Sequence, residues 1–344
     1  MGQPRAYTVK SAKYSLGQWT NDIIESSEYP NGNQGDDLRQ LNDDASRYVI
    51  KSAGCGPQDY ELETEAAKGQ ATGIWVSEHI LELNTIGRFM TASLDGGLGA
   101  TGIPFMPGAL PGYYFRPATI HEVQMFAYNF VKWNAHTALT PADTCLNKLG
   151  SMEVRDGLVV CDSSLNMMKT RLYKLQNPIG DANWAASCRF AVPQSLQRAL
   201  SFIQTIMGVF DYYDDENVKN RHAKAYQLVM EEMAFFEISY EAQFSIDISK
   251  QWQDRWETFM NAHFLRVEAH TRIWVQNKLA DLYSIWESAR ETSCRTGDLA
   301  SCVYSLSAVW LLEEYRLAVD QKQKLVFDPT IFGNTNSMVT TWKK

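Results

Sequence analysis

The sequence predicts a mainly α-helical protein, and two observations support this. Apolar residues recur at helical spacing through almost all of the second half of the 344-residue chain. Neither a series of alternating strands nor a repeat of fixed period competes with that pattern. Aromatic residues make up 12% of the chain, and such residues build large apolar pockets. We therefore expect a helical bundle or array around a central apolar cavity.

The chain is expected to have three parts. Residues 1–60 form a polar N-terminal segment that includes an exposed loop at 30–37, where Pro, Asn, Gly and Asp cluster. Residues 61–330 form a single helical domain, which is long enough to bury a substantial core. Residues 331–344 form a C-terminal tail.

Helical patterns follow one another along this domain. The first spans 72–91, and an irregular Gly/Pro-rich segment at 95–117 follows it, which cannot hold a helix and could form a lid or a wall. Pro193 suits the first turn of its helix, and Asn217 is placed to cap the helix after it. The remaining helices are expected at about 120–133, 164–175, 193–212, 218–244, 251–292 and 299–323.

Composition excludes several classes of partner. A net charge of -8 argues against nucleic acid, because surfaces that neutralise phosphates are normally basic. No apolar run approaches the roughly 18 to 20 residues needed to cross a bilayer, and residues 1–16 contain no signal-peptide core. We expect a soluble protein without a transmembrane segment, cytoplasmic unless its cysteines form disulfides, in which case it is secreted. The sequence leaves the oligomeric state open.

The six cysteines include no CxxC pair, which argues against a zinc ribbon or a thioredoxin-type site. Cys294 and Cys302 flank a Thr-Gly-Asp turn. They are the local pair best placed for a disulfide if the compartment is oxidising.

Four carboxylates follow a long apolar helix and are the first candidate metal ligands: Asp211, Asp214, Asp215 and Glu216. Carboxylate oxygens are the ligands that Mg²⁺ prefers, so the run could hold this ion. The alternative is a solvated turn between two helices, where acidic residues favour the N-terminus of the second helix.

Glu237 and Glu241 are the second pair of candidate metal ligands. They lie four residues apart on one helical face within an apolar stretch. Buried carboxylates are costly unless they are paired or bound to a metal. A partly exposed helix edge is the alternative.

Cations near these acids could hold an anionic group. Arg221 and Lys224 follow the acidic run, whereas Lys250, Arg272 and Lys278 lie on later helices. A diphosphate bound through a metal needs such donors. Each of these side chains could equally be an ordinary surface residue.

Other polar clusters are weaker candidates. His263 and His270 lie seven residues apart with Glu268 between them, but no zinc or iron motif accompanies them. Glu78 and Glu82 flank an apolar run and suit capping or packing. The chain also lacks a GxSxG motif, a P-loop and a complete GxGxxG fingerprint.

The aromatic helical half and its acidic run resemble the class I terpene cyclases, which are helical enzymes that ionise a prenyl diphosphate with Mg²⁺. That family's first motif is DDxxD/E, whereas this chain has the order DxxDDE from Asp211 to Glu216. The family's second, NSE-type motif has its nearest approach at Asn166, Thr170 and Lys174, where lysine replaces glutamate.

A closer resemblance is to the divergent fungal humulene synthases of tropolone-sesquiterpenoid pathways. This resemblance implies farnesyl diphosphate as the substrate, two Mg²⁺ ions and an essential lysine, which Lys278 or Lys250 would supply. Arg221, Lys224 and Arg272 would hold the diphosphate. Aromatic faces such as Tyr240 and Trp274 would stabilise the carbocation. The implied function is that of a sesquiterpene synthase, a carbon–oxygen lyase.

A second resemblance supplies the rival hypothesis. Residues 73–83, Gly-Ile-Trp-Val-Ser-Glu-His-Ile-Leu-Glu-Leu, are similar to a segment of fungal secreted chitinase-associated proteins. This resemblance implies a fungal origin and a non-catalytic secreted interaction protein, stabilised by disulfides.

Overall fold

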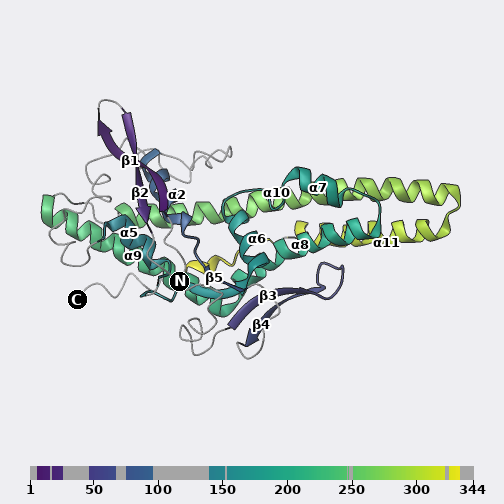
Figure 1. The fold of residues 1–344 in the computed structure, drawn as a ribbon, viewed down its shortest axis with the longest axis horizontal. Coiled ribbons are helices and arrows are strands. Elements are labelled where there is room, and N and C mark those ends of the chain that lie inside the picture. The colour runs from purple at the N-terminus through teal and green to yellow at the C-terminus, as the bar shows by residue number, and fades with distance from the viewer. Residues whose placement is uncertain are drawn as a thin grey trace.

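The computed structural model describes residues 6–15, 18–25, 46–66, 75–95, 139–151, 153–245, 247, 251–321 and 325–333. Within these ranges the chain forms eight α-helices, so the mainly helical class is confirmed (Figure 1). They are α2 (Asn84–Asp95), α5 (Pro141–Lys148), α6 (Ser163–Tyr173), α7 (Asp181–Cys188), α8 (Pro193–Asp214), α9 (Glu216–Phe244), α10 (Gln251–Thr296) and α11 (Leu299–Asp320). A short 3₁₀ helix, η2 (Pro329–Phe332), follows.

The described strands form two small sheets. The antiparallel pair β1 (Ala6–Ser15) and β2 (Gln18–Glu25) makes the first. The second has the order β4-β3-β6-β5, from β3 (Ser46–Ser52), β4 (Tyr60–Ala66), β5 (Trp75–His79) and β6 (Leu158–Asp162). Its β3–β6 pair is parallel and the others are antiparallel. The apolar, mostly buried run of β6 suits an inner strand.

The expected helix at 72–91 is wrong in its first part. Residues 75–79 form β5, which pairs with β6 so that Trp75 lies opposite Asp162 and His79 opposite Leu158. The helix begins only at Asn84, after a buried turn. A short apolar run has the same appearance in a buried strand and in a helix, and here the tertiary pairing with β6 decides between them.

The other described helical patterns are confirmed. Those at 164–175, 193–212, 218–244, 251–292 and 299–323 correspond to α6, α8, α9, α10 and α11, and Pro193 occupies the first turn of α8. The short helices α5 and α7 were not expected, because eight residues hold too few apolar positions to show a period. The helix expected at 120–133, the loop at 30–37 and residues 96–117 of the Gly/Pro-rich segment lie outside the described residues.

Aromatic side chains fill much of the described core. Phe89 of α2 lies edge-on to Trp252, Trp256 and Phe259 of α10, with ring centroids 5.1 to 5.9 Å apart. Such edge-to-face contacts stabilise a packed interior. These rings therefore contact one another, and the central apolar cavity stays a prediction.

A long helical hairpin dominates the shape of the molecule. The 46 residues of α10 extend for about 69 Å, and α11 returns along it. Its closed end projects beyond α7 and α8 (Figure 1). None of the described helices is both long enough and apolar enough to cross a bilayer.

Candidate functional site

The acidic run lies at the junction of α8 and α9, where two tyrosines contact it. Tyr60 donates a hydrogen bond to Asp211 Oδ2 at 2.6 Å, and Tyr48 donates to Asp215 Oδ1 at 3.0 Å. Burial raises the pKa of Tyr48 to about 12 and that of Tyr60 further, so both hydroxyls stay protonated donors. Two of the four carboxylates of the acidic run are therefore engaged with the second sheet.

Asp215, not Asn217, caps α9. Its carboxylate accepts hydrogen bonds from the backbone N–H groups of Asn217 and Val218, both at 3.1 Å. The Asn217 side chain instead donates to the Tyr48 hydroxyl at 2.8 Å. The expectation for Asn217 is wrong because α8 ends at Asp214, which leaves a single residue between the helices to serve as the cap.

Three carboxylates near the junction of α8 and α9 influence one another: Asp211, Asp214 and Asp328. Surrounding protein and the negative charges of Asp211 and Asp328 raise the pKa of Asp214. Hydrogen bonds from Thr330 and Lys219 lower the pKa of Asp328 to about 2, and Lys219 Nζ lies 3.1 Å from its Oδ2. Glu216 is exposed and 3.9 Å from the same ammonium group. This end of the junction is acidic but partly neutralised.

Glu237 has a structural partner. It is buried and accepts hydrogen bonds at the start of α10 from the backbone N–H of Trp252 at 2.6 Å and of Gln253 at 3.2 Å. Glu241, one turn later, is exposed. Glu237 is 21 residues beyond Glu216 on the uninterrupted α9, which separates them by about 32 Å. The structure therefore does not bring this pair together with the acidic run.

The predicted cations are dispersed as well. Lys278 of α10 pairs with Asp181 of α7 at 2.9 Å, and Arg272 donates to the backbone oxygen of Leu325 at 3.2 Å. Arg221 contacts Asn217 at 3.1 Å, Lys224 is exposed, and Lys250 lies outside the described residues. No two of the four described cations share a partner among these contacts.

The two predicted aromatic residues also lie apart. Trp274 of α10 is buried against Trp184 at 5.4 Å between ring centroids, and the Lys278 ammonium sits 5.5 Å from its ring. Tyr240 of α9 is buried between Phe236 and Phe244. In the described part of the chain, no three His, Cys, Asp or Glu residues lie close enough to hold a metal ion. Magnesium often binds through only one or two carboxylates together with substrate phosphates.

Sequence reasoning missed a buried ionic centre beneath β5. The Lys169 side chain of α6 is only 1% exposed and forms ion pairs with Glu78 and, at 3.2 Å, Glu82. It also donates to the backbone oxygens of His79 at 2.6 Å and Ile80 at 3.3 Å. The available signal was that Lys169 lies four residues after Leu165, on the apolar face of its helix. These contacts satisfy the N–H donors of the ammonium group, so we assign the buried ion pairs a structural role.

The two histidines of α10 lie beside the C-terminal end of α6. His263 is near the backbone of Tyr173 and His270 near that of Gln176, and Arg88 donates to the carbonyl of Lys174 at 2.8 Å. Burial, together with Arg88 and Arg266, lowers the pKa of His263 to about 3. Positive and donor groups at this helix end complement its dipole.

A surface groove of about 510 Å³ lies between α6, α7 and α8. Arg171 and Arg198 line it beside apolar groups such as Met168 and Phe202, so its chemistry suits an amphiphilic anion. Arg198 is 13 residues before Asp211 on α8, a separation of about 20 Å. The groove and the acidic junction are therefore two separate places.

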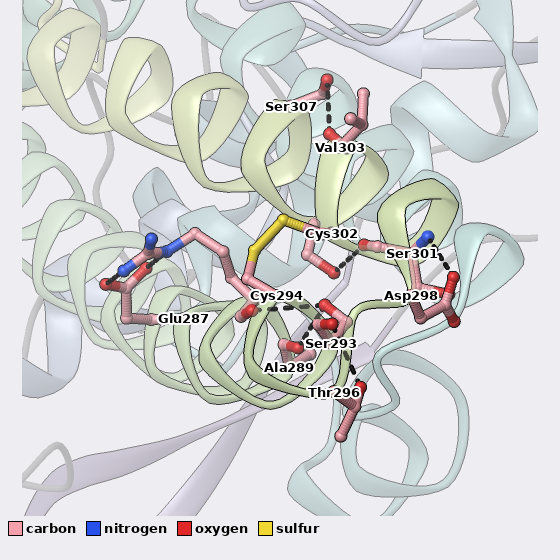
Figure 2. The surroundings of a disulfide bond; sticks show 12 residues. Glu287, Ala289, Ser293, Cys294, Thr296, Asp298, Ser301, Cys302, Val303 and Ser307 are labelled. Atoms are coloured by element: carbon pink, nitrogen blue, oxygen red, sulfur yellow. Dashed lines mark hydrogen bonds and ion pairs between the residues drawn. A yellow bond between two sulfur atoms is a disulfide. The ribbon is translucent and has the colours of Figure 1, made fainter.

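The expected disulfide between Cys294 and Cys302 is confirmed at the closed end of the hairpin (Figure 2). Gly297, at φ +79°, ends α10: its N–H lies 3.4 Å from the Cys294 oxygen, and that of Asp298 lies 3.1 Å from the Ser293 oxygen. Asp298 then caps α11 by accepting from Ser301 N–H at 3.2 Å. Four cysteines are free: Cys55, Cys145, Cys161 and Cys188.

The helix α11 is apolar on two opposite faces. One is buried and includes Ala308, Leu312 and Tyr315. The other carries five exposed residues, which we call the α11 stripe: Leu299, Val303, Leu306, Trp310 and Leu317. Their spacing of four, three, four and seven residues is that of a coiled-coil seam. Leu299 is 76% exposed and Trp310 is 70% exposed.

Comparison of the chain with protein-family models, with curated proteins and with solved structures finds no match.

Proposed function

We propose that this protein is a non-catalytic interaction protein of an oxidising compartment, and that the α10–α11 hairpin docks with its partner. The α11 stripe carries this proposal. A helix that is apolar on both faces is normally buried on both. In α11 only one of the two apolar faces is buried, and the other is exposed. Contiguous exposed apolar surface of this kind marks sites of protein–protein contact.

The build of the hairpin supports the same function. A disulfide closes its end, a positive-φ glycine terminates α10, and Asp298 caps α11. A surface held in one conformation loses little entropy when it binds, which strengthens docking. The resemblance of residues 73–83 to fungal secreted chitinase-associated proteins agrees with a protein that forms disulfides.

A photo-crosslinking experiment tests the proposal. The benzophenone amino acid would replace Trp310 in one variant and Ile238 in a matched control, because Ile238 is an exposed apolar residue of α9 far from α11 in sequence. Both would be irradiated in the medium or extract where the protein occurs. A discrete adduct from position 310 alone is expected. Failure of position 310 to form any adduct, with itself or another chain, would overturn the proposal.

The oxidising compartment has a separate test. Free thiols of the protein would be alkylated at harvest, before unfolding, and the peptides mapped by mass spectrometry. The peptide that joins Cys294 to Cys302 is expected to be intact. Recovery of both cysteines in alkylated form would contradict the proposal that the protein occupies an oxidising compartment.

A sesquiterpene synthase is the second candidate, and the acidic junction favours it. Burial, together with the charges of Asp211 and Asp328, raises the pKa of Asp214, and a bound divalent cation would relieve the repulsion among these carboxylates. Farnesyl diphosphate and Mg²⁺ should then yield a humulene-like hydrocarbon and free diphosphate. Asp214→Asn should abolish that product and Glu241→Gln should not. Absence of both products from the unmodified protein would reject this candidate.

A further inference from the structure

We propose that the partner of the α11 stripe is a second copy of this chain, docked antiparallel about a two-fold axis near residue 308. This inference rests on the proposed function of the hairpin and names its partner. A stripe that repeats every three or four residues matches another helix, which offers the same spacing of knobs and holes. A two-fold pair makes one surface complementary to itself.

The sequence of the stripe selects a register. With the axis at residue 308, Leu299 of one chain lies beside Leu317 of the other, and Leu306 lies beside Trp310. Four of the five stripe residues thereby contact apolar partners. The fifth, Val303, lies beside Glu313, whose charge is balanced by Arg316 at 2.8 Å.

Charge favours the antiparallel direction. The C-terminal half of α11 carries Glu313, Glu314 and Asp320 against the single Arg316, whereas its N-terminal half is uncharged. A parallel pair would place the acidic halves together. An antiparallel pair instead places each acidic half beside the uncharged half of the other α11, near a closed end where Arg295 and Asp298 offset each other.

Shape agrees with this direction. A groove of about 600 Å³ lies between α11 and the turn of residues 55–59, and Leu317 lines it. In the proposed register the closed end of the partner's hairpin, which projects from the rest of the molecule (Figure 1), reaches this groove on the other copy.

The area sets the expected affinity. The exposed parts of the five stripe side chains amount to roughly 550 Å² per chain and about 1,100 Å² for a pair, near the lower limit for a specific interface. We therefore expect a reversible dimer with a Kd of about 1 to 100 µM.

Sedimentation velocity of the full chain, from about 1 µM to several hundred µM, tests the pairing. The unmodified protein should pass from monomer to dimer in this range. Trp310→Glu should raise Kd at least about tenfold, because central aromatic residues dominate such interfaces. Ile238→Glu should leave Kd unchanged, and thermal melts would show that both variants are folded.

Cysteine crosslinking tests the register in a Cys55→Ser background. The variant L299C/L317C should form an intermolecular disulfide under mild oxidation, identified by peptide mapping. Its two positions are 18 residues apart, about 27 Å on one helix, so they cannot join within a chain. Crosslinking of L299C alone would indicate a parallel pair and overturn the register.

The outcomes separate this inference from the function on which it rests. A monomer at every concentration, with a photo-adduct between Trp310's position and a different macromolecule, overturns self-pairing and leaves the interaction function standing. A monomer without any adduct overturns both.

Discussion

Lys169 lies in the interior with its ammonium group surrounded by oxygen atoms from Glu78, Glu82 and the backbone of β5 and the following turn. Burial lowers the pKa of Lys169 well below its ordinary value. Thr170 adds a hydrogen bond to Glu82 at 2.6 Å. A buried charge of this kind depends on its partners, since removing one leaves the others desolvated and unpaired.

Lys169→Met is expected to lower the free energy of unfolding by about 3 to 5 kcal/mol, because it strands two buried carboxylates. Urea denaturation measures the change. Lys224→Met is the matched control, since Lys224 is exposed on α9 and should shift stability by less than about 0.5 kcal/mol. A Lys169 variant as stable as the control would show that the ion pairs do not form.

His222 makes stability depend on pH. Its ring is buried, donates from Nδ1 to the Ile331 carbonyl at 2.8 Å, and has a pKa lowered by burial from 6.5 to about 4. Below pH 6.5 the unfolded chain therefore binds more protons at His222 than the folded chain does. The stability that the neutral, buried ring allows is fully present above pH 6.5 and is lost as the pH falls towards 4. His222→Gln should flatten the denaturation-derived stability profile by up to about 3 kcal/mol over this window. An unchanged profile would contradict a buried neutral histidine.

At the junction of α9 and α10, a side chain of the first helix caps the N-terminus of the second. The N-terminus of α10 has unpaired N–H groups, and Glu237 of α9 accepts from two of them while Gln253 Nε2 donates to its other oxygen at 2.8 Å. Such a cap also places negative charge at the positive end of the helix dipole. The carboxylate of Glu237, which the sequence suggested as a metal ligand, therefore has its hydrogen-bond partners at the start of α10.

Glu237→Ala should destabilise the protein by about 1 to 2 kcal/mol through loss of the cap. Hydrogen exchange should accelerate most at the amides of Trp252 and Gln253. Glu241→Ala, one turn away and exposed, should change neither quantity. Equal effects of the two substitutions would argue against capping by Glu237.

Distant parts of the chain are joined across the whole molecule by a few polar contacts. The hydroxyl of Tyr315 on α11 donates to the carbonyls of Cys55 at 2.9 Å and Gly56 at 3.1 Å, across 260 and 259 residues. Nearby, Gln204 of α8 donates to the carbonyls of Gly54 and Gly56. The turn after β3 thereby holds α8 and α11 in place.

Tyr315→Phe should cost about 1 kcal/mol, since it leaves backbone carbonyls without one donor but keeps the buried ring. Hydrogen exchange of residues 53–59 should accelerate with it. Tyr304→Phe removes the hydroxyl of an exposed tyrosine from the same helix and should leave both observables unchanged. Unchanged hydrogen exchange at residues 53–59 in the Tyr315 variant would show that the Tyr315 hydroxyl does not hold this turn against α11.

The sequence by itself determined the helical class, the bounds of the five described long helices to within a few residues and the Cys294–Cys302 pair. These features depend on local physics: the period of apolar residues, Pro193 in a first turn and two cysteines across a short turn. The same local signal could not separate β5 from a helix, because a strand is defined by the partner it pairs with.

Only the tertiary structure decided what the polar residues do. Glu237 and Glu241 share one face in sequence, yet the first caps α10 and the second is exposed. Lys169 is buried because two glutamates, from β5 and the turn after it, pair with its ammonium group. The α11 stripe is exposed because α10 packs on the opposite face of α11 and not on the stripe. The free energy of a charge or an apolar face depends on the groups that surround it, and folding brings those groups from distant positions in the chain.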